Sequence, residues 1–155
     1  MTCFSLYATK NLAAGEGGIL STGDDSVAEA VRNMRLTRRG DGSSYDQVTP
    51  GFKANLSDVL ASIALVQLDK LDRHAEIRAR QFALYDEGLA GLAGISPLAR
   101  DPRDGHARHL YVVRIHEGEA GGTRDAYQRL LGEESISTSI HFLPVHRLTW
   151  FRGRY

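Results

Sequence analysis

The stretch FSLYATKNLAAGEGGILS, residues 4–21, decides the fold of the first part of this chain. It follows Met1 almost directly and holds two short apolar segments, residues 3–7 and 17–22, separated by a connection rich in small residues and glycine. Short apolar segments bounded by glycine are typical of strands. The pattern therefore predicts two strands joined by a polar turn, with Lys10 in the connection.

The residues that follow this stretch predict the start of a helix. Asp24 and Asp25 can cap a helix whose apolar residues recur at helical spacing and which we expect to end around residues 39–40. Residues 38–52 are rich in glycine, serine and charge, so we expect a loop there.

A longer helical pattern follows this loop. Ser57 and Asp58 form a strong helix start, and apolar residues continue on one face to about Leu92 without a proline. We therefore expect one long helix, with a kink allowed, of about nine turns at roughly 3.6 residues each. Gly94 is expected to stop it.

The last part of the chain mixes strand and helix signals. Residues 109–115 read as a buried strand, residues 123–131 as a short helix capped by Thr123 or Asp125, and residues 136–142 as a last strand before Pro144. A loop is expected around residues 97–106. The order strand, helix, strand favours a two-layer α/β arrangement, preceded by a piece of another layer.

The amino-acid composition of the chain excludes several classes of function. With 42% hydrophobic and 25% charged residues, a chain of 155 residues can bury the core of a globular domain. Lys plus Arg (19) equals Asp plus Glu (19), so charge gives no attraction to nucleic acid or to an anionic membrane. The single cysteine, Cys3, and the lack of an apolar run of about eighteen residues favour the cytoplasm.

Six histidines invite a metal hypothesis, because neutral imidazole is a common metal ligand. No pair of them has the i, i+4 spacing of a helical ligand pair, and no set of carboxylates or thiolates accompanies them. We therefore expect no metal site.

Four blocks of sequence, taken together and in chain order, indicate a resemblance to known proteins. They are FSLYATKNL with GEGG (residues 4–12 and 15–18), GFKANLSD (51–58), HLY (109–111) and STSIHFLPVH (137–146). In this order they resemble the DegT/DnrJ/StrS family of sugar aminotransferases, which depend on pyridoxal phosphate. The sequence departs from that family at Arg39-Gly40, where a His-Gly pair is usual.

The resemblance implies a fold. Residues 1–56 would be the carboxyl-terminal part of the large cofactor-binding domain of the aspartate-aminotransferase-like α/β fold, called fold type I. Residues 57–155 would be the long connecting helix and the small α/β domain, truncated at its end. The chain is then expected to begin within a domain and to be too short to work alone, because the missing part would carry most of the cofactor pocket.

The resemblance also implies roles for four residues. Lys10 would bind the aldehyde of pyridoxal phosphate and then move protons as a general base and acid. Ser5 would contact the cofactor phosphate, Asn55 would reach the partner's phosphate across a dimer, and His141 would face the substrate. Their alternatives stay open: Ser5 as a turn hydroxyl bonded to backbone, Asn55 as a residue at a helix start, and His141 in a structural hydrogen bond.

The activity implied for the parent enzyme is transfer of an amino group, with glutamate as the expected donor, to a nucleotide-linked keto-deoxysugar. The expected assembly is a homodimer, with no nucleic acid or membrane as partner. The alternative is a truncated, noncatalytic interaction module, because apolar surface left by a missing domain favours association.

Overall fold

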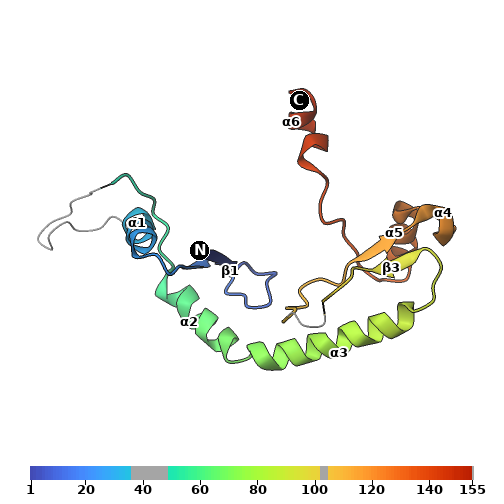
Figure 1. The fold of residues 1–155 in the computed structure, drawn as a ribbon, viewed down its shortest axis with the longest axis horizontal. Coiled ribbons are helices and arrows are strands. Elements are labelled where there is room, and N and C mark those ends of the chain that lie inside the picture. The colour runs from blue at the N-terminus through green and yellow to red at the C-terminus, as the bar shows by residue number, and fades with distance from the viewer. Residues whose placement is uncertain (36–48, 102–104, 155) are drawn as a thin grey trace, which may run out of the picture. The chain divides into compact units, whose positions relative to one another are not determined.

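The computed structural model describes residues 1–35, 49–101 and 105–154. The chain divides into two compact units, Met1–Phe82 with Gly105–Leu110 and Ala83–Asp104 with Tyr111–Tyr155. Figure 1 shows the helices and strands of both units along one ribbon. Within the described ranges, no helix is both long enough and apolar enough to cross a membrane.

The first unit begins with the predicted pair of strands. β1 (Thr2–Ser5) and β2 (Gly18–Ser21) are antiparallel, with Ser5 opposite Gly18. The connection between them folds back over Leu6, whose side chain is only 2% exposed, and over the buried Ala14. Two strands joined by a connection that holds Lys10 are therefore confirmed, and the connection has a small apolar core of its own.

The first helix, α1 (Asp25–Arg35), starts where the sequence predicted. Asp24 Oδ1 accepts hydrogen bonds from the backbone N–H groups of Ser26 at 2.8 Å and Val27 at 3.3 Å. The hydrogen bond from the Ser26 hydroxyl and these two backbone bonds lower the pKa of Asp24. The expected helix end at Arg39-Gly40, and most of the loop expected over residues 38–52, lie outside the described residues.

The apolar stretch after residue 57 forms two helices, α2 (Asp58–Leu68) and α3 (Leu71–Leu89), where one was expected. Ser57 caps α2 as predicted. Between the helices the chain tightens, because the N–H of Lys70 donates to the carbonyl of Gln67, three residues back, at 3.2 Å. The expectation of one long helix, with a kink allowed, is therefore corrected to two helices with a break at residues 69–70, and the second ends at Leu89, before the expected residue 92.

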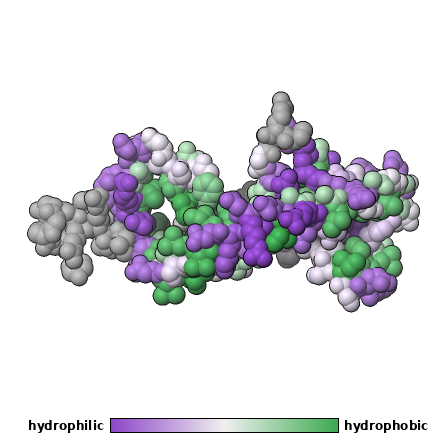
Figure 2. Space-filling view, turned by 90° about the horizontal axis from the view of Figure 1, so that it is seen from below, coloured by the Kyte–Doolittle hydropathy of each residue, from purple (hydrophilic) through white to green (hydrophobic). Residues whose placement is uncertain are grey.

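The two helices differ in surface character. Figure 2 shows apolar surface over α2 and mainly polar surface over α3. No residue of α2 is buried, and Val59 and Leu65 are 70% and 65% exposed. A helix that is apolar on all sides is usually buried in a folded protein. The α2 surface is therefore a packing surface that the described residues leave largely uncovered.

The second unit contains a small sheet and several short helices. β3 (Ile95–Pro97) pairs antiparallel with β4 (Val113–Ile115). The helical elements that follow are α4 (Glu117–Ala120), α5 (Arg124–Glu133), the 3-10 turn η1 (Val145–Arg147) and α6 (Thr149–Arg152). Thr123 caps α5 through its Oγ1, which accepts from the N–H of Ala126 at 3.2 Å. The predicted helix and one of its two candidate caps are thus confirmed.

Two strand expectations for this unit need correction, and one strand was not expected. The strand expected over residues 109–115 is reduced to β4, and β3 was not predicted: only its last residue, Pro97, falls in the expected loop. Residues 136–142 form no strand: the N–H of Ile136 donates to the carbonyl of Leu131 at 2.8 Å, and the carbonyl of Thr138 accepts from Gln128 Nε2 at 3.2 Å. These backbone groups are therefore bonded to α5 and not to a neighbouring strand.

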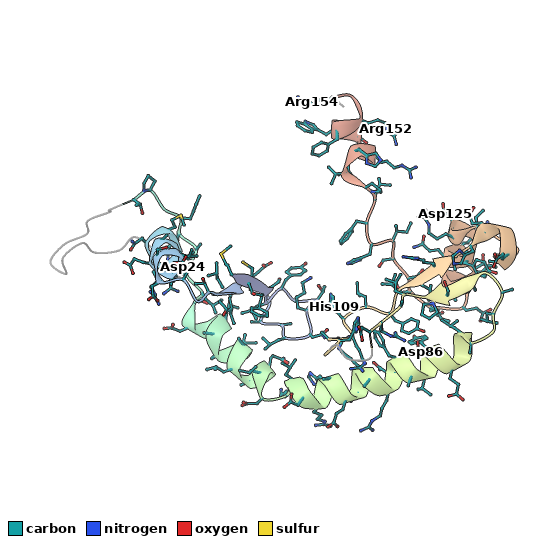
Figure 3. The ribbon with its side chains drawn as sticks, viewed as in Figure 1. Asp24, Asp86, His109, Asp125, Arg152 and Arg154 are labelled. Atoms are coloured by element: carbon teal, nitrogen blue, oxygen red, sulfur yellow. The ribbon has the colours of Figure 1, made fainter. Side chains whose placement is uncertain are left out.

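A polar cluster ties α3 to the segments beside the β3–β4 sheet. Asp86 of α3, labelled in Figure 3, accepts hydrogen bonds from the Tyr111 hydroxyl at 2.7 Å and from the Arg100 guanidinium. The Arg100 guanidinium also lies 5.5 Å from the centre of the Tyr111 ring, and the Tyr85 ring is 4.8 Å from that ring. No local sequence pattern predicts this cluster, because its members are far apart along the chain.

From the pKa shifts of Asp86 and Tyr111 we expect the free energy of unfolding to fall at both low and high pH. The hydrogen bond from Arg100, followed by that from Tyr111, lowers the pKa of Asp86 below its ordinary 3.8. The stability that Asp86 contributes is therefore present above that ordinary value and is lost as pH falls through the folded pKa. Burial, followed by the bond to Asp86, raises the pKa of Tyr111 above 10.0, so its contribution is lost as pH rises through the folded value.

Asp86→Asn should therefore flatten the acid limb of the stability profile. Urea unfolding between about pH 5 and about pH 3 should show a smaller fall in unfolding free energy for this variant than for the parent chain. Asp125→Asn, which removes an exposed carboxylate of α5, is the control (Figure 3). Equal acid sensitivity of the parent chain and Asp86→Asn would rule out this role for the cluster.

Gly94 has both a backbone and a packing reason to be glycine. Its φ is +69°, and a Cβ built on it would lie 2.2 Å from the backbone nitrogen of Ala120. Gly91 has a similar φ of +78°, but nothing lies within 4 Å of its Cβ position. Comparison of Gly91 with Gly94 therefore separates the cost of a positive φ from the cost of a close backbone contact.

Gly91→Ala should lower the unfolding free energy by about 1 kcal/mol, the typical penalty of a positive φ for alanine. Gly94→Ala should lower it by about 2 kcal/mol more, because the neighbouring backbone must move. Thermal or urea unfolding of the two variants provides the comparison. Equal losses would show that the approach to Ala120 is not needed for stability.

Candidate functional site

Lys10 lies in the loop between β1 and β2, at the end of a tight turn. Its backbone N–H donates to the carbonyl of Tyr7 at 2.9 Å, and its side chain is half-buried. Among the residues that the structure describes, the Lys10 amine has no hydrogen-bond or ion-pair partner. The loop thus presents a primary amine that is available for reaction.

The backbone of this loop is closed at its base. The N–H of Leu6 donates to the carbonyl of Gly17 at 2.9 Å, and the N–H of Ala8 donates to the carbonyl of Gly15 at 2.9 Å. A Cβ on Gly17 would lie 2.7 Å from the Leu56 side chain, so the loop base also packs against the residues that lead into α2. The base of the lysine loop is therefore held by hydrogen bonds and by packing.

Ser5 ends β1 and directly precedes the loop. Its Oγ accepts a hydrogen bond from the N–H of Tyr7 at 3.3 Å, which is the turn-hydroxyl role named as its alternative. A serine hydroxyl that accepts one hydrogen bond still has its own O–H to donate. The observed bond therefore orients the Ser5 hydroxyl and leaves its donor for an anion.

Asn55 is half-buried and lies two residues before the Ser57 cap of α2. Its Oδ1 accepts a hydrogen bond from Lys53 Nζ. This contact uses the amide oxygen and leaves the NH2 group as the donor that would meet an anion. The position at the helix start and the role expected for Asn55 are therefore compatible.

Sequence reasoning missed the contacts of Asn11, the residue after Lys10. Asn11 Nδ2 donates to the carbonyl of Ala107, and Asn11 Oδ1 lies 3.2 Å from His109 Nδ1. Arg78 of α3 donates to the carbonyls of Arg108 and His109 at 3.3 and 3.2 Å. Asn11 and His109 both lie in sequence blocks that were singled out, residues 4–12 and 109–111. Nothing in the sequence showed that the two blocks are in contact.

His141 belongs to the second unit, whereas Lys10, Ser5 and Asn55 belong to the first. The His141 side chain is exposed, and its ring stacks on Phe142 with the ring centres 3.9 Å apart. No group of three His, Cys, Asp or Glu side chains in the described parts of the chain is arranged to hold a metal ion. The substrate-facing role of His141 remains a prediction.

The donor set of the first unit suits an aldehyde that also carries a phosphate. A lysine amine can condense with an aldehyde, and a hydroxyl and an amide NH2 can donate to phosphate oxygens. Lys10, Ser5 and Asn55 supply these three groups within one unit. The residues present therefore fit pyridoxal phosphate by their chemistry.

Comparison with known proteins identifies the family of this chain. The whole chain, residues 1–155, matches the profile of the DegT/DnrJ/EryC1/StrS aminotransferase family. The spore coat polysaccharide biosynthesis protein SpsC of Bacillus subtilis is 39% identical over 170 residues, which cover 99% of this chain and 42% of SpsC. The chain thus spans about two-fifths of the length of this relative.

Solved structures give the same result. DesI, crystallised in the presence of its TDP-sugar product, superimposes with a TM-score of 0.86 and 29% identity over 99% of this chain and 39% of DesI. The PLP-form of Spr1654 from Streptococcus pneumoniae superimposes with a TM-score of 0.80 and 30% identity, over 98% of this chain and 40% of that one. The expected fold class, part of the α/β fold type I, is confirmed by these structures.

The cofactor expectation is confirmed in the same way. Spr1654 was solved in both a PLP-form and a PMP-form, and each matches this chain at 30% identity. Pyridoxal phosphate is therefore the cofactor indicated for this family and fold. From the match over its full length, the chain belongs to the DegT/DnrJ/EryC1/StrS aminotransferase family.

Proposed function

We propose that this chain is the lysine-bearing part of an enzyme that transfers an amino group, from glutamate, to a nucleotide-linked keto-deoxysugar. The observation that carries the proposal is the Lys10 amine, without a partner among the described residues, in a loop closed by backbone hydrogen bonds. The polysaccharide role in the name of SpsC and the TDP-sugar product of DesI support a nucleotide-linked sugar as substrate.

Pyridoxal phosphate, when bound, supplies the electron sink for breaking a C–H bond. Lys10 would hold the aldehyde of the cofactor through its amine, and that amine would serve as the general base and acid of the reaction. The Ser5 hydroxyl and the Asn55 amide group would donate to the phosphate, and His141 would face the sugar. In this arrangement Ser5 would orient the cofactor from the end of β1, directly before the loop that presents Lys10.

The proposed domain organisation follows the site residues. Residues 1–56 would belong to the large cofactor-binding domain, and residues 57–155 would form the connecting helices and the small α/β domain. Family members are longer than this chain, which covers 42% of SpsC. We therefore expect the isolated chain to capture the cofactor weakly and to turn over negligibly, because preorganised walls make such sites catalyse.

A homodimer is the proposed assembly. The supporting observation is α2, which is apolar on all sides and has no buried residue in this chain. Asn55 directly precedes this helix, so a partner that covers α2 would come close to the Asn55 amide group. The proposed compartment is the cytoplasm, where the exposed thiol of Cys3 would remain reduced.

The first test is to locate where pyridoxal phosphate binds covalently. The full chain would be incubated with the cofactor, reduced with borohydride and mapped by peptide mass spectrometry. Lys10 should carry more label than Lys53 and Lys70, the other two lysines of the sequence, and Lys10→Arg should remove that label without changing the others. Label spread evenly over the lysines would overturn the proposal and favour a noncatalytic interaction module, for which the open α2 surface already provides a contact face.

A second test addresses Ser5. Ser5→Ala should reduce Lys10 labelling by pyridoxal phosphate by about fivefold, because one hydrogen bond to a phosphate, worth about 1 kcal/mol, is lost. Labelling by pyridoxal, which lacks the phosphate, should not change. Ser21→Ala, at the far end of β2, is the matched control. An equal loss with both reagents would show that Ser5 shapes the loop and does not contact the phosphate.

A further inference from the structure

We propose that Asn11 and His109 are positioning residues for Lys10, and that their hydrogen-bonded pair fixes the tip of the lysine loop. The inference rests on the proposed function, in which Lys10 is the reactive amine. It concerns two residues outside the proposed set of Lys10, Ser5, Asn55 and His141.

The base of the lysine loop and its tip are held in different ways. Backbone hydrogen bonds between Leu6 and Gly17 and between Ala8 and Gly15 hold the base. At the tip, the link to a distant part of the chain runs through the Asn11 side chain, which reaches Ala107, 96 residues later. Lys10 is covalently joined to Asn11, so movement of the tip moves the lysine backbone.

The segment that Asn11 reaches is itself anchored. Arg78 on α3 donates to the carbonyls of Arg108 and His109, and the rings of Phe82 and His106 lie 6.1 Å apart. Phe82 is only 7% exposed. The turn at residues 106–109 is therefore fixed to α3 and provides a firm point of attachment for the loop.

A strained backbone residue at this turn supports a specific role. Arg108 has a φ of +48°, a left-handed backbone conformation that is unfavourable for a non-glycine residue. Its N–H donates to His106 Nδ1 at 3.0 Å. In this conformation the carbonyls of Arg108 and His109 both bond to Arg78, while the carbonyl of Ala107 accepts from Asn11.

The direction of the hydrogen bond between Asn11 and His109 follows from the other contact of Asn11. Because Asn11 uses its NH2 group on the carbonyl of Ala107, the atom facing His109 Nδ1 is the amide oxygen, which can only accept. His109 must therefore carry a proton on Nδ1. Figure 3 shows His109 beside the β1–β2 loop of the same unit.

The consequence for chemistry is geometric. A reacting group displaced by about 1 Å can lose about a hundredfold in rate, and the flexible lysine side chain cannot correct the direction from which its backbone presents it. Asn11 and His109 thus act on the reaction through the placement of Lys10, with no contact to substrate or cofactor required.

The test compares Asn11→Ala, His109→Ala and the double variant in the full chain. Lys10 reactivity is measured first without cofactor, as the ratio of Lys10 to Lys70 acetylation by trace acetic anhydride. Each single variant should change this ratio by about threefold or more, and the double variant should change it no further, because both remove one arrangement. His116→Ala, which removes a histidine bonded to Ser96 in the second unit, should leave the ratio unchanged.

Rescue separates positioning from general destabilisation. His109→Asn retains an N–H donor near the Nδ1 position and should restore the parent ratio, whereas His109→Leu should not. Asn11→Asp keeps the acceptor for His109 but turns a carboxylate oxygen towards the carbonyl of Ala107, so it should behave like Asn11→Ala. Unfolding curves for each variant establish that the compared samples are folded.

A cofactor measurement distinguishes this inference from the proposed function. The rate of borohydride-trapped labelling of Lys10 by pyridoxal phosphate should fall about tenfold or more in Asn11→Ala and His109→Ala. If the parent chain takes no label on Lys10 while the acetylation ratio responds as expected, the proposed function fails and the positioning role holds. Ratios that are unchanged in both single variants, or additive changes in the double variant, would overturn the positioning role.

Discussion

The hydrogen bond from the N–H of Leu6 to the carbonyl of Gly17 closes the loop between β1 and β2, and the position of Lys10 depends on that closure. It brings the ends of a twelve-residue connection together over Leu6, the most deeply buried large side chain of the described residues. Because Gly17 packs against Leu56, the same closure joins the loop to the start of α2. The Lys10 amine is thereby presented from a loop with its own apolar core, which is the preorganisation that the proposed site needs.

The rest of the molecule divides between surfaces that are satisfied within this chain and surfaces that are not. The cluster of Asp86, Arg100 and Tyr111 pairs its charges and hydroxyl within the second unit. The α2 helix, by contrast, has no buried residue and keeps several large apolar side chains exposed. Within the described residues, the polar groups of the cluster are paired, whereas much of the apolar surface of α2 is not covered.

Local chemistry explains which elements could be predicted. The strand pair around Lys10, the Asp24 and Ser57 caps and the Thr123 cap were predictable, because each depends on a few neighbouring residues. The strand expected at residues 136–142 was wrong, and the long helix, for which a kink was allowed, is divided in two. At the division the N–H of Lys70 donates to the carbonyl of Gln67, three residues back, and at residues 136–138 α5 takes up backbone groups that a strand would need.

The sequence by itself determined the family, the identity of the reactive lysine candidate and the helix starts, since these reside in contiguous blocks of residues. Only the tertiary structure decided that Asn11 meets His109 and Ala107, and that Asp86 meets Arg100 and Tyr111. The physical reason is that these hydrogen bonds join residues 14 to 98 positions apart. Spacing along the chain holds no record of such contacts until the backbone has folded and brought a donor within about 3 Å of its acceptor.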